Sequence, residues 1–313
     1  TVLKDAAATS LYGSRAAFGV ILITTKRAKA GETKVSANAY TGIQQVPKNG
    51  RPELMNGTEW AQFRKEHYED MGIDVPDAFK NPSQYGEGYD WYDAMLRTAM
   101  IGDYSVSVNA SKGDFTSSVV LGYFRQEGVV NNSSYNRFTA RANNEYKFND
   151  KFKIAFNIAP SFSFDDAPPA DGFFGSGGGL LDNARLTPPI LSWKDADGSL
   201  PVTVTTPGVT SFETPNWIRS AKDITNKSQW NRLLTNGYLE YELIKDLKLK
   251  TSISVDLGNS NTHYFQPSTA GRAFAAAPSK INAYLADKTF RYWSWLSENT
   301  VSYAKQFGDH SFD

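Results

Sequence analysis

The chain has 313 residues, and its 33 Lys and Arg residues balance its 33 Asp and Glu residues. This balance gives no electrostatic reason to expect nucleic acid as a partner. Cysteine is absent, which excludes disulfides and thiolate metal sites. The longest apolar run, from Phe18 to Ile23, is far shorter than the roughly 18 residues that a membrane-spanning helix needs. If such a chain crosses a membrane, it has to do so as a β-barrel.

The segment 2–27 predicts a short helix, a turn and a buried strand. Ala and Leu favour a helix from Lys4 to Leu11, and Gly13 can adopt the left-handed conformation that ends helices. Residues 20–25 form a continuous apolar and β-branched run, which is typical of a strand buried on both faces. On this pattern alone, a buried helix–strand unit of an ordinary globular protein explains the segment equally well.

Alternation of apolar and polar residues then marks a series of strands. In the clearest of them, Phe152, Ile154 and Phe156 alternate with Lys153 and Asn157. Successive side chains of a strand point to opposite faces, so each strand has one apolar and one polar surface. The predicted strands are 34–44, 103–111, 115–126, 136–148, 151–164, 232–243, 247–257 and 290–304, with a ninth beginning at His310.

The connections between these strands alternate between short and long. Tight turns are expected at 112–114, 149–150, 245–246 and 308–309, and long connections at about 45–102, 127–135, 165–228 and 258–289. Outer-membrane barrels have this asymmetry, with short periplasmic turns and long extracellular loops. A soluble β-sandwich with mixed loop lengths, carrying a carbohydrate-binding face, is the alternative.

Two of the long connections have features of their own. The first predicts a helix from Asn56 to Glu69, with Thr58 as its N-cap, and a second short helix from Trp91 to Met100. The third is rich in Gly and Pro over residues 168–189, which suits a binding or gating loop.

Catalytic and metal-binding patterns are missing from the sequence. The three histidines are far apart, and no nucleophile, zinc or phosphate-loop motif occurs. The run from Asp195 to Gly198 lacks the distal Glu of a calcium loop, so we interpret it as a β-turn. We therefore predict no enzyme activity, no metal site and no cofactor.

Three stretches, in order, resemble the SusC/RagA branch of the TonB-dependent outer-membrane transporters. SVSVNASKG at 105–113 resembles an early barrel strand of that family, and LGYFRQEGVV at 121–130 resembles the strand that follows. In the opening segment, Phe18 and Ala28 stand where the family usually has Asn and Gly. The opening segment resembles the end of the plug domain, with matching positions Lys4, Asp5, Tyr12, Gly13, Arg15, Gly19, Thr24 and Lys26.

The resemblance implies an all-β-dominated fold. Residues 1–30 would be the C-terminal part of an α/β plug domain. Residues 31–313 would be the N-terminal portion of a transmembrane antiparallel β-barrel, about eight to nine of its roughly twenty-two strands. The long loops, about 45–102, 165–228 and 258–289, would then be extracellular. The chain would be an internal fragment of a longer protein.

The resemblance also implies a function. Such proteins import oligosaccharides or peptides across the outer membrane of Gram-negative bacteria, with a SusD-like lipoprotein as a lid. TonB would bind a segment that precedes residue 1. A siderophore-type TonB-dependent receptor and a non-transporting surface-binding barrel remain as alternatives.

Aromatic and charged residues are assigned roles by their position. Aromatic residues near strand ends fit interfacial girdles, and those in the loops either contact the ligand or the lid, or anchor the loop folds. The polar row Arg137, Arg141, Asn143 and Glu145 is expected to line the seam between plug and barrel. The girdle candidates are Tyr104, Phe148, Phe152, Phe164, Trp293 and Trp295. The loop candidates are Trp91, Tyr92, Phe173, Phe174, Trp193 and Trp217.

Overall fold

The computed structural model describes residues 2–3, 19–21, 32–170, 179–205, 213–271, 282–307 and 310–312. Two short strands, β1 (Val2–Leu3) and β2 (Val20–Ile21), pair antiparallel within the opening segment. The predicted opening helix and its turn lie outside the described residues, as do Phe173 and Phe174. Of the eight positions that match the plug, Gly19 alone is described, so the division at residue 30 stays a prediction.

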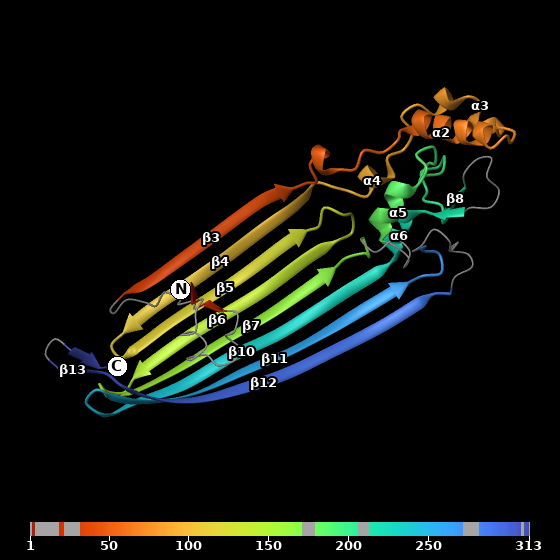
Figure 1. The fold of residues 1–313 in the computed structure, drawn as a ribbon. Helices are drawn as coiled ribbons and strands as arrows, with labels where there is room; N and C mark the ends of the chain where they lie inside the picture. The colour runs from red at the N-terminus through yellow and green to blue at the C-terminus, as the bar shows by residue number, and fades with distance from the viewer. Residues whose placement is uncertain are drawn as a thin grey trace.

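Eight antiparallel strands form one continuous sheet (Figure 1). Their order across the sheet is β12-β11-β10-β7-β6-β5-β4-β3, so each of these strands pairs with its neighbours along the chain. This confirms the eight predicted strands, although the last three are longer than predicted. Their bounds are β3 (Thr33–Gln44), β4 (Ala99–Lys112), β5 (Phe115–Glu127), β6 (Ser134–Lys147), β7 (Phe152–Asp166), β10 (Thr225–Ile244), β11 (Leu247–Gln266) and β12 (Tyr284–Tyr303). Two further short strands follow, β13 (Lys305–Phe307) and β14 (His310–Phe312).

The short and the long connections lie at opposite ends of the sheet (Figure 1). At the turn end, Gly113 and Asp246 adopt positive φ angles of 56° and 72°. The Asn149 side chain accepts hydrogen bonds from the backbone N–H groups of Lys151 and Phe152, both at 2.9 Å. These are local interactions between near neighbours, which is why the turns could be predicted from residue type. The long connections all leave from the other end, which we call the loop end.

The strand register gives the sheet one apolar and one polar face. We call the face that carries Phe156 and Leu121 the outer face, and the face that carries Asn157 the inner face. Large apolar side chains on the outer face are uncovered, with Phe156 51%, Leu121 56% and Trp293 70% exposed. A soluble protein rarely leaves so many large apolar side chains exposed on one face. The outer face therefore has the chemistry of a surface that contacts lipid.

Aromatic rings gather at both ends of the apolar region on the outer face. Near the loop end, the ring centroids of Tyr123 and Phe138 lie 4.6 Å apart. Near the turn end, the Phe148 ring lies 4.7 Å from Tyr146 and 5.0 Å from Phe152. Phe138 and Tyr146 are both on β6, about 26 Å apart along the strand. At a strand tilt of about 40° this spacing corresponds to a band of about 20 Å, comparable to the apolar band of outer-membrane barrels.

Five of the six predicted girdle residues lie on the outer face by register, but not all at its ends, and Phe148 follows the end of β6 with its ring 5.0 Å from Phe152. Trp293 and Trp295 lie in the middle of β12, because this strand begins at Tyr284 rather than near residue 290. They pair with Leu257 and Val255 of β11, within the apolar region.

The described parts of the long connections fold into a layer at the loop end, which we call the cap (45–98, 167–170, 179–205, 213–224 and 267–271). Phe79, Trp91, Met95, Leu180 and Trp217 are fully buried there. They belong to one hydrophobic cluster, so the apolar core of the described residues lies in the cap and not over the sheet. Its elements are η2 (Lys48–Gly50), α2 (Gly57–Asp70), α3 (Asp77–Lys80), η3 (Pro82–Tyr85), α4 (Trp91–Ala94), α5 (Leu180–Leu186), β8 (Thr203–Thr205), β9 (Glu213–Pro215) and α6 (Trp217–Asp223).

The helix α2 starts where a capping box forms. The Asn56 side chain accepts from the backbone N–H of Glu59, and the Glu59 carboxylate accepts from the backbone N–H of Asn56, both at 2.9 Å. The prediction of Thr58 as the N-cap is therefore wrong; its hydroxyl donates to the Gly86 carbonyl at 3.1 Å. The helix predicted from Trp91 to Met100 ends at Ala94, because β4 begins at Ala99.

No helix in the described ranges is long and apolar enough to cross a membrane.

Candidate functional site

Hydrogen bonds join neighbouring strands across the inner face. Asn157 donates to Asn236 Oδ1 at 3.3 Å, and Asn236 donates to Ser254 Oγ at 2.8 Å. The Tyr238 hydroxyl donates to Glu145 Oε2 at 2.8 Å, which joins β10 to β6 across β7. These bonds satisfy side-chain polar groups and fix their orientation, so the inner face is an ordered polar surface.

The four residues predicted for the plug–barrel seam all lie on this inner face by register. Arg141, Asn143 and Glu145 line a shallow depression of about 230 Å³. The Arg137 guanidinium lies 5.5 Å from the centroid of the Phe124 ring, on the neighbouring strand. Their contact with a plug stays a prediction, because most of the opening segment lies outside the described residues.

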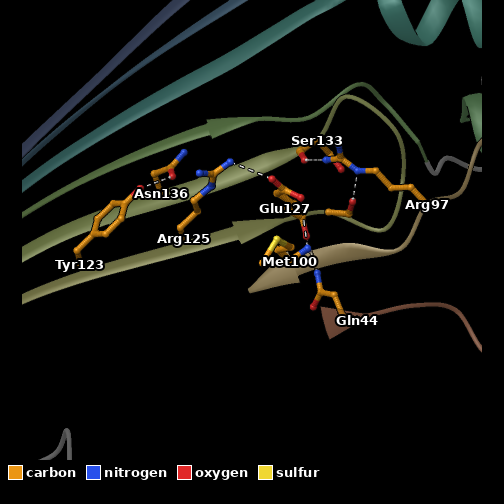
Figure 2. Close-up of polar contacts among 9 residues, drawn as sticks. Gln44, Arg97, Met100, Tyr123, Arg125, Glu127, Ser133 and Asn136 are labelled. Atoms are coloured by element: carbon orange, nitrogen blue, oxygen red, sulfur yellow. Dashed lines mark hydrogen bonds and ion pairs between the residues drawn. The ribbon is translucent and has the colours of Figure 1, made fainter. Parts of the chain in front are cut away.

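Glu127 joins three strands at the loop end of the sheet (Figure 2). Its carboxylate accepts from the backbone N–H of Met100 at 3.3 Å and from Arg125 at 2.9 Å. Its backbone carbonyl accepts from the side-chain amide of Gln44, at the end of β3. One residue of β5 thus holds the ends of β3 and β4 in register with it.

Arg97, which lies just before β4, binds the hairpin loop between β5 and β6, residues 128–133 (Figure 2). Its guanidinium donates to the carbonyls of Gly128 at 2.9 Å and Ser133 at 2.7 Å. A Cβ atom on Gly128 would lie 1.9 Å from Ser133 Oγ, so a larger residue there requires the loop to shift. The sequence Gln126-Glu127-Gly128, which carries part of the family resemblance, therefore has a physical reason: a carboxylate joins the strands, and a glycine lets the hairpin close.

The same hairpin loop connects the sheet to the cap. The Asn131 side chain donates to the Ala94 carbonyl at 2.9 Å, at the end of α4. The Asn132 side chain donates to the Ala221 carbonyl at 3.3 Å, in α6. Asn132 has a φ of 61°, a conformation that Asn tolerates better than most residues. A six-residue loop thus contacts both major parts of the cap and holds them over the rim of the sheet.

Two of the predicted ligand-contacting aromatics lie in the cap core. Trp91 is 1% exposed and Trp217 is 0% exposed. Their indole N–H groups donate to the Leu191 carbonyl at 2.9 Å and to Thr187 Oγ1 at 2.7 Å. Both side chains are held in the cap core by these bonds, and their role as ligand or lid contacts stays a prediction.

Trp193 and Tyr92 are half-buried. The Trp193 ring lies 5.7 Å from Trp91 and 5.3 Å from Tyr89, in edge-to-face geometry. A groove of about 430 Å³, bordered by Tyr89, Asp90 and Arg185, opens beside this cluster. The structure thus brings Trp91 and Trp193 together, and their role as ligand contacts stays a prediction.

Among the described residues, no three His, Cys, Asp or Glu side chains are placed to hold a metal ion. The run from Asp195 to Gly198 forms a turn in which the Gly198 N–H donates to the Asp195 carbonyl at 2.9 Å. The Asp197 carboxylate accepts from the backbone N–H of Ser199 at 2.9 Å, and this bond lowers the pKa of Asp197. The acidic side chain serves the turn itself.

Three aromatic residues on the inner face, near the loop end of the sheet, were not among the sequence-based candidates. These are Trp230, Phe290 and Tyr292, which lie on β10 and β12. Next to them, Arg232 and Asp256 form a bidentate ion pair at 2.9 and 2.7 Å. The signal in the sequence is a break in alternation: an aromatic residue occupies an inward position where the pattern expects a polar one.

No family model matches the chain. In sequence, it is 30% identical over 316 residues to TonB-dependent receptor P26 of Formosa agariphila, which covers 99% of the chain and 30% of the relative. It is 29% identical over 334 residues to TonB-dependent receptor SusC of Bacteroides thetaiotaomicron, which covers 100% of the chain and 31% of the relative. The chain thus spans about 30% of the length of the curated relatives that it matches.

The fold is similar to that of a solved transporter. The RagAB peptide transporter matches with a TM-score of 0.79 and 24% identity, over 98% of the chain and 37% of the matched chain. At this identity the match establishes the fold, an antiparallel sheet that is part of a barrel wall. Three observations agree with this match: the sheet has one apolar and one polar face, the sequence motifs occur in the order of the family, and the sequence similarity covers nearly the whole chain. Over nearly its whole length, the chain is thus similar to part of the SusC/RagA-like TonB-dependent transporters.

Proposed function

We propose that the protein to which this chain belongs imports oligosaccharides or peptides across the outer membrane of a Gram-negative bacterium. Import is TonB-dependent and uses a SusD-like lipoprotein as a lid. The observation that carries the proposal is the arrangement of the wall: one apolar face, one ordered polar face, and a folded cap at the loop end. The sequence similarity of this chain to part of the TonB-dependent receptors supports it.

The outer face supports a location in the bilayer. Hydrocarbon offers no hydrogen-bond partners, so the edges of β3 and β12, which pair with no further strand among the described residues, need partner strands in a membrane. A closed barrel supplies those strands and leaves the apolar outer face to the lipid. The aromatic clusters near the two ends of the apolar region then lie at the two interfaces.

The cap supports an extracellular gate. It sits at the end with long connections, which is the outer side in barrels of this class. The RagAB peptide importer is described in a "closed-closed" and an "open-open" state. In the proposed importer, lid and plug are in equilibrium between an open and a closed state. A ligand shifts this equilibrium only by the difference between its affinities for the two states.

The test uses the bacterium of origin and its chromosomal genes. The gene that encodes this chain and a neighbouring gene for a SusD-like lipoprotein are deleted separately. Uptake of labelled oligosaccharides and of labelled peptides is then measured. We expect each deletion to abolish uptake of the same ligand class, because wall and lid form one importer.

Two results would favour other functions. Ligand binding at the cell surface without accumulation indicates a non-transporting binding barrel. Iron-repressed expression, with loss of iron uptake on deletion of the receptor gene and no dependence on a lid gene, indicates a siderophore-type receptor.

A further inference from the structure

The two faces of the sheet exchange character near the loop ends of β10, β11 and β12. On the outer face, Asn231 and Arg291 lie in one row and are polar. On the inner face, the adjacent row contains Trp230, Ser260 and Phe290 in direct register. Deeper in the sheet the pattern is the opposite, with apolar residues outside and polar residues inside. The inner face thus becomes aromatic at the level where the outer face becomes polar.

The aromatic side chains of this region lie over small residues of β11. The ring centroids of Trp230 and Phe290 are 6.4 Å apart, across Ser260, which is 6% exposed. The Tyr292 ring covers Gly258, where an added Cβ would lie 2.2 Å from the ring. Phe290 and Tyr292 are 6.0 Å apart. Trp230, Phe290 and Tyr292 therefore form a continuous layer across three strands, which we call the aromatic platform.

The platform presents ring surface and is bordered by fixed polar groups. Trp230 is 46% exposed and Phe290 is 55% exposed. The Arg232 guanidinium binds both oxygens of Asp256, and the Tyr292 hydroxyl donates to Asp256 Oδ1 at 3.2 Å. The indole N–H of Trp230 has no hydrogen-bond partner within the described part of the chain. The site thus combines apolar ring surface, a free donor and an internally neutralised ion pair.

The platform lies below the cap on the same face of the sheet. Tyr264, an inner-face residue of β11, packs against the cap core. It is four residues beyond Ser260, which places the platform about 13 Å from that contact along the strand. Next to the platform, a groove of about 570 Å³ runs along the wall, bordered by Arg141, Ser161 and Arg232. A ligand that has passed the cap therefore meets the platform and this groove.

We propose that the aromatic platform binds a sugar ring of an oligosaccharide. This inference rests on the proposed import function and names its ligand class. A pyranose ring offers a flat C–H surface to the aromatic rings and hydroxyl groups to the polar border. A peptide is commonly held through its main chain by an open sheet edge. In the closed barrel proposed above, the platform has no such edge, because β10 and β11 are paired on both sides and a further strand pairs with β12.

The experiment compares the same substitution on the two faces of the sheet. Trp230→Leu removes the platform ring and keeps an apolar side chain. Trp295→Leu, on the outer face of β12, is the matched control, and Trp230→Phe tests rescue by a smaller ring. All three are introduced into the chromosomal gene, and the amount of protein in the outer membrane is measured by immunoblot.

Binding to the purified full-length protein in detergent is measured separately from uptake. The carbohydrate probe is a partial hydrolysate of a polysaccharide on which the deletion strain fails to grow, or of starch if no such defect is found. The peptide probe is a tryptic digest of casein. We expect Trp230→Leu to weaken carbohydrate binding on the order of tenfold or more, Trp230→Phe to restore part of it, and Trp295→Leu to leave it unchanged.

The outcomes separate the platform from the transport function. Carbohydrate binding that depends on Trp230, without uptake in cells, supports the platform and refutes import. Uptake with unchanged carbohydrate binding in Trp230→Leu overturns the platform and leaves import standing. A wild-type protein that binds no carbohydrate, or a Trp230→Leu defect confined to the peptide probe, overturns the assignment to sugars.

Discussion

We predict that Trp217 stabilises the folded cap, and that this stability does not depend on the stability of the barrel wall. Trp217 is fully buried in the cap core, and its indole donates to Thr187. A buried Trp removes about 200 Å² from water, which at about 25 cal/mol per Å² corresponds to about 5 kcal/mol. This is an upper estimate, because an unfolded chain already buries part of that surface. Trp217→Ala should therefore cost the cap about 3–5 kcal/mol.

A second variant separates packing from hydrogen bonding. Trp217→Phe keeps most of the ring in the core but leaves the Thr187 hydroxyl without its donor. Loss of one buried hydrogen bond, with little change in apolar burial, costs about 1–2 kcal/mol. The expected order of cap stability is wild type, then Trp217→Phe, then Trp217→Ala.

The assay is cleavage of the cap by a protease added outside intact cells. When the cap opens and closes faster than it is cut, the cleavage rate follows the equilibrium population of the open form. A loss of about 4 kcal/mol then raises the rate about a thousandfold, and a loss of about 1.5 kcal/mol raises it about tenfold. The barrel should assemble normally, as seen from its heat-modifiable mobility in gels. Equal cleavage in all three proteins, or failure of the barrel itself, would refute the independence of the cap core.

Three further predictions concern the rim, the outer face and a loop turn. Gly128→Ala should destabilise the protein by about 1–3 kcal/mol, because the new Cβ meets Ser133 Oγ; adding Ser133→Gly should recover part of the loss in thermal unfolding. Phe156→Lys should cost about 2–4 kcal/mol if this face lies in lipid, whereas Ser118→Lys on the inner face should cost less, as measured by outer-membrane assembly yield. Asp197 stabilises its turn at pH values above the ordinary carboxyl pKa. This stabilisation is lost as the pH falls through the lowered pKa of Asp197. Asp197→Ala should therefore raise protease cleavage of the turn at pH 7, and the wild type should match it only in acid; equal cleavage of the two at pH 7 would contradict this.

The strands and their order were predictable because period-two alternation and turn chemistry are local signals. Gly113, Asn149 and Asp246 act on neighbouring backbone groups, so residue type alone located the turns. The ends of the last three strands were harder to predict. Near Trp230 and Phe290 the outer face becomes polar and the inner face becomes aromatic. The alternation there no longer follows the pattern of the rest of the sheet, in which apolar residues point outward and polar residues inward.

The roles of the aromatic residues could not be predicted from position in the sequence. Trp91 and Trp217 are in loops, where exposure is common, yet both are in the cap core because segments far apart in the chain meet there. Trp230 is in a strand, yet its ring is exposed on the inner face. Burial depends on which segments pack together, and spacing along the chain carries no direct record of it.

The sequence by itself determined a two-faced antiparallel wall, its strand order and its resemblance to one branch of transporters, because these depend on side-chain alternation, short turns and local motifs. The tertiary structure alone decided that the long connections form a cap with its own core, and that small residues of β11 let three rings lie across it. It also decided that Glu127 joins the strand ends at the rim, and that Asn131 and Asn132 connect this rim to the cap. These features depend on contacts between residues that are distant in the chain. Such contacts contribute stabilising free energy only after the strands of the wall have assembled.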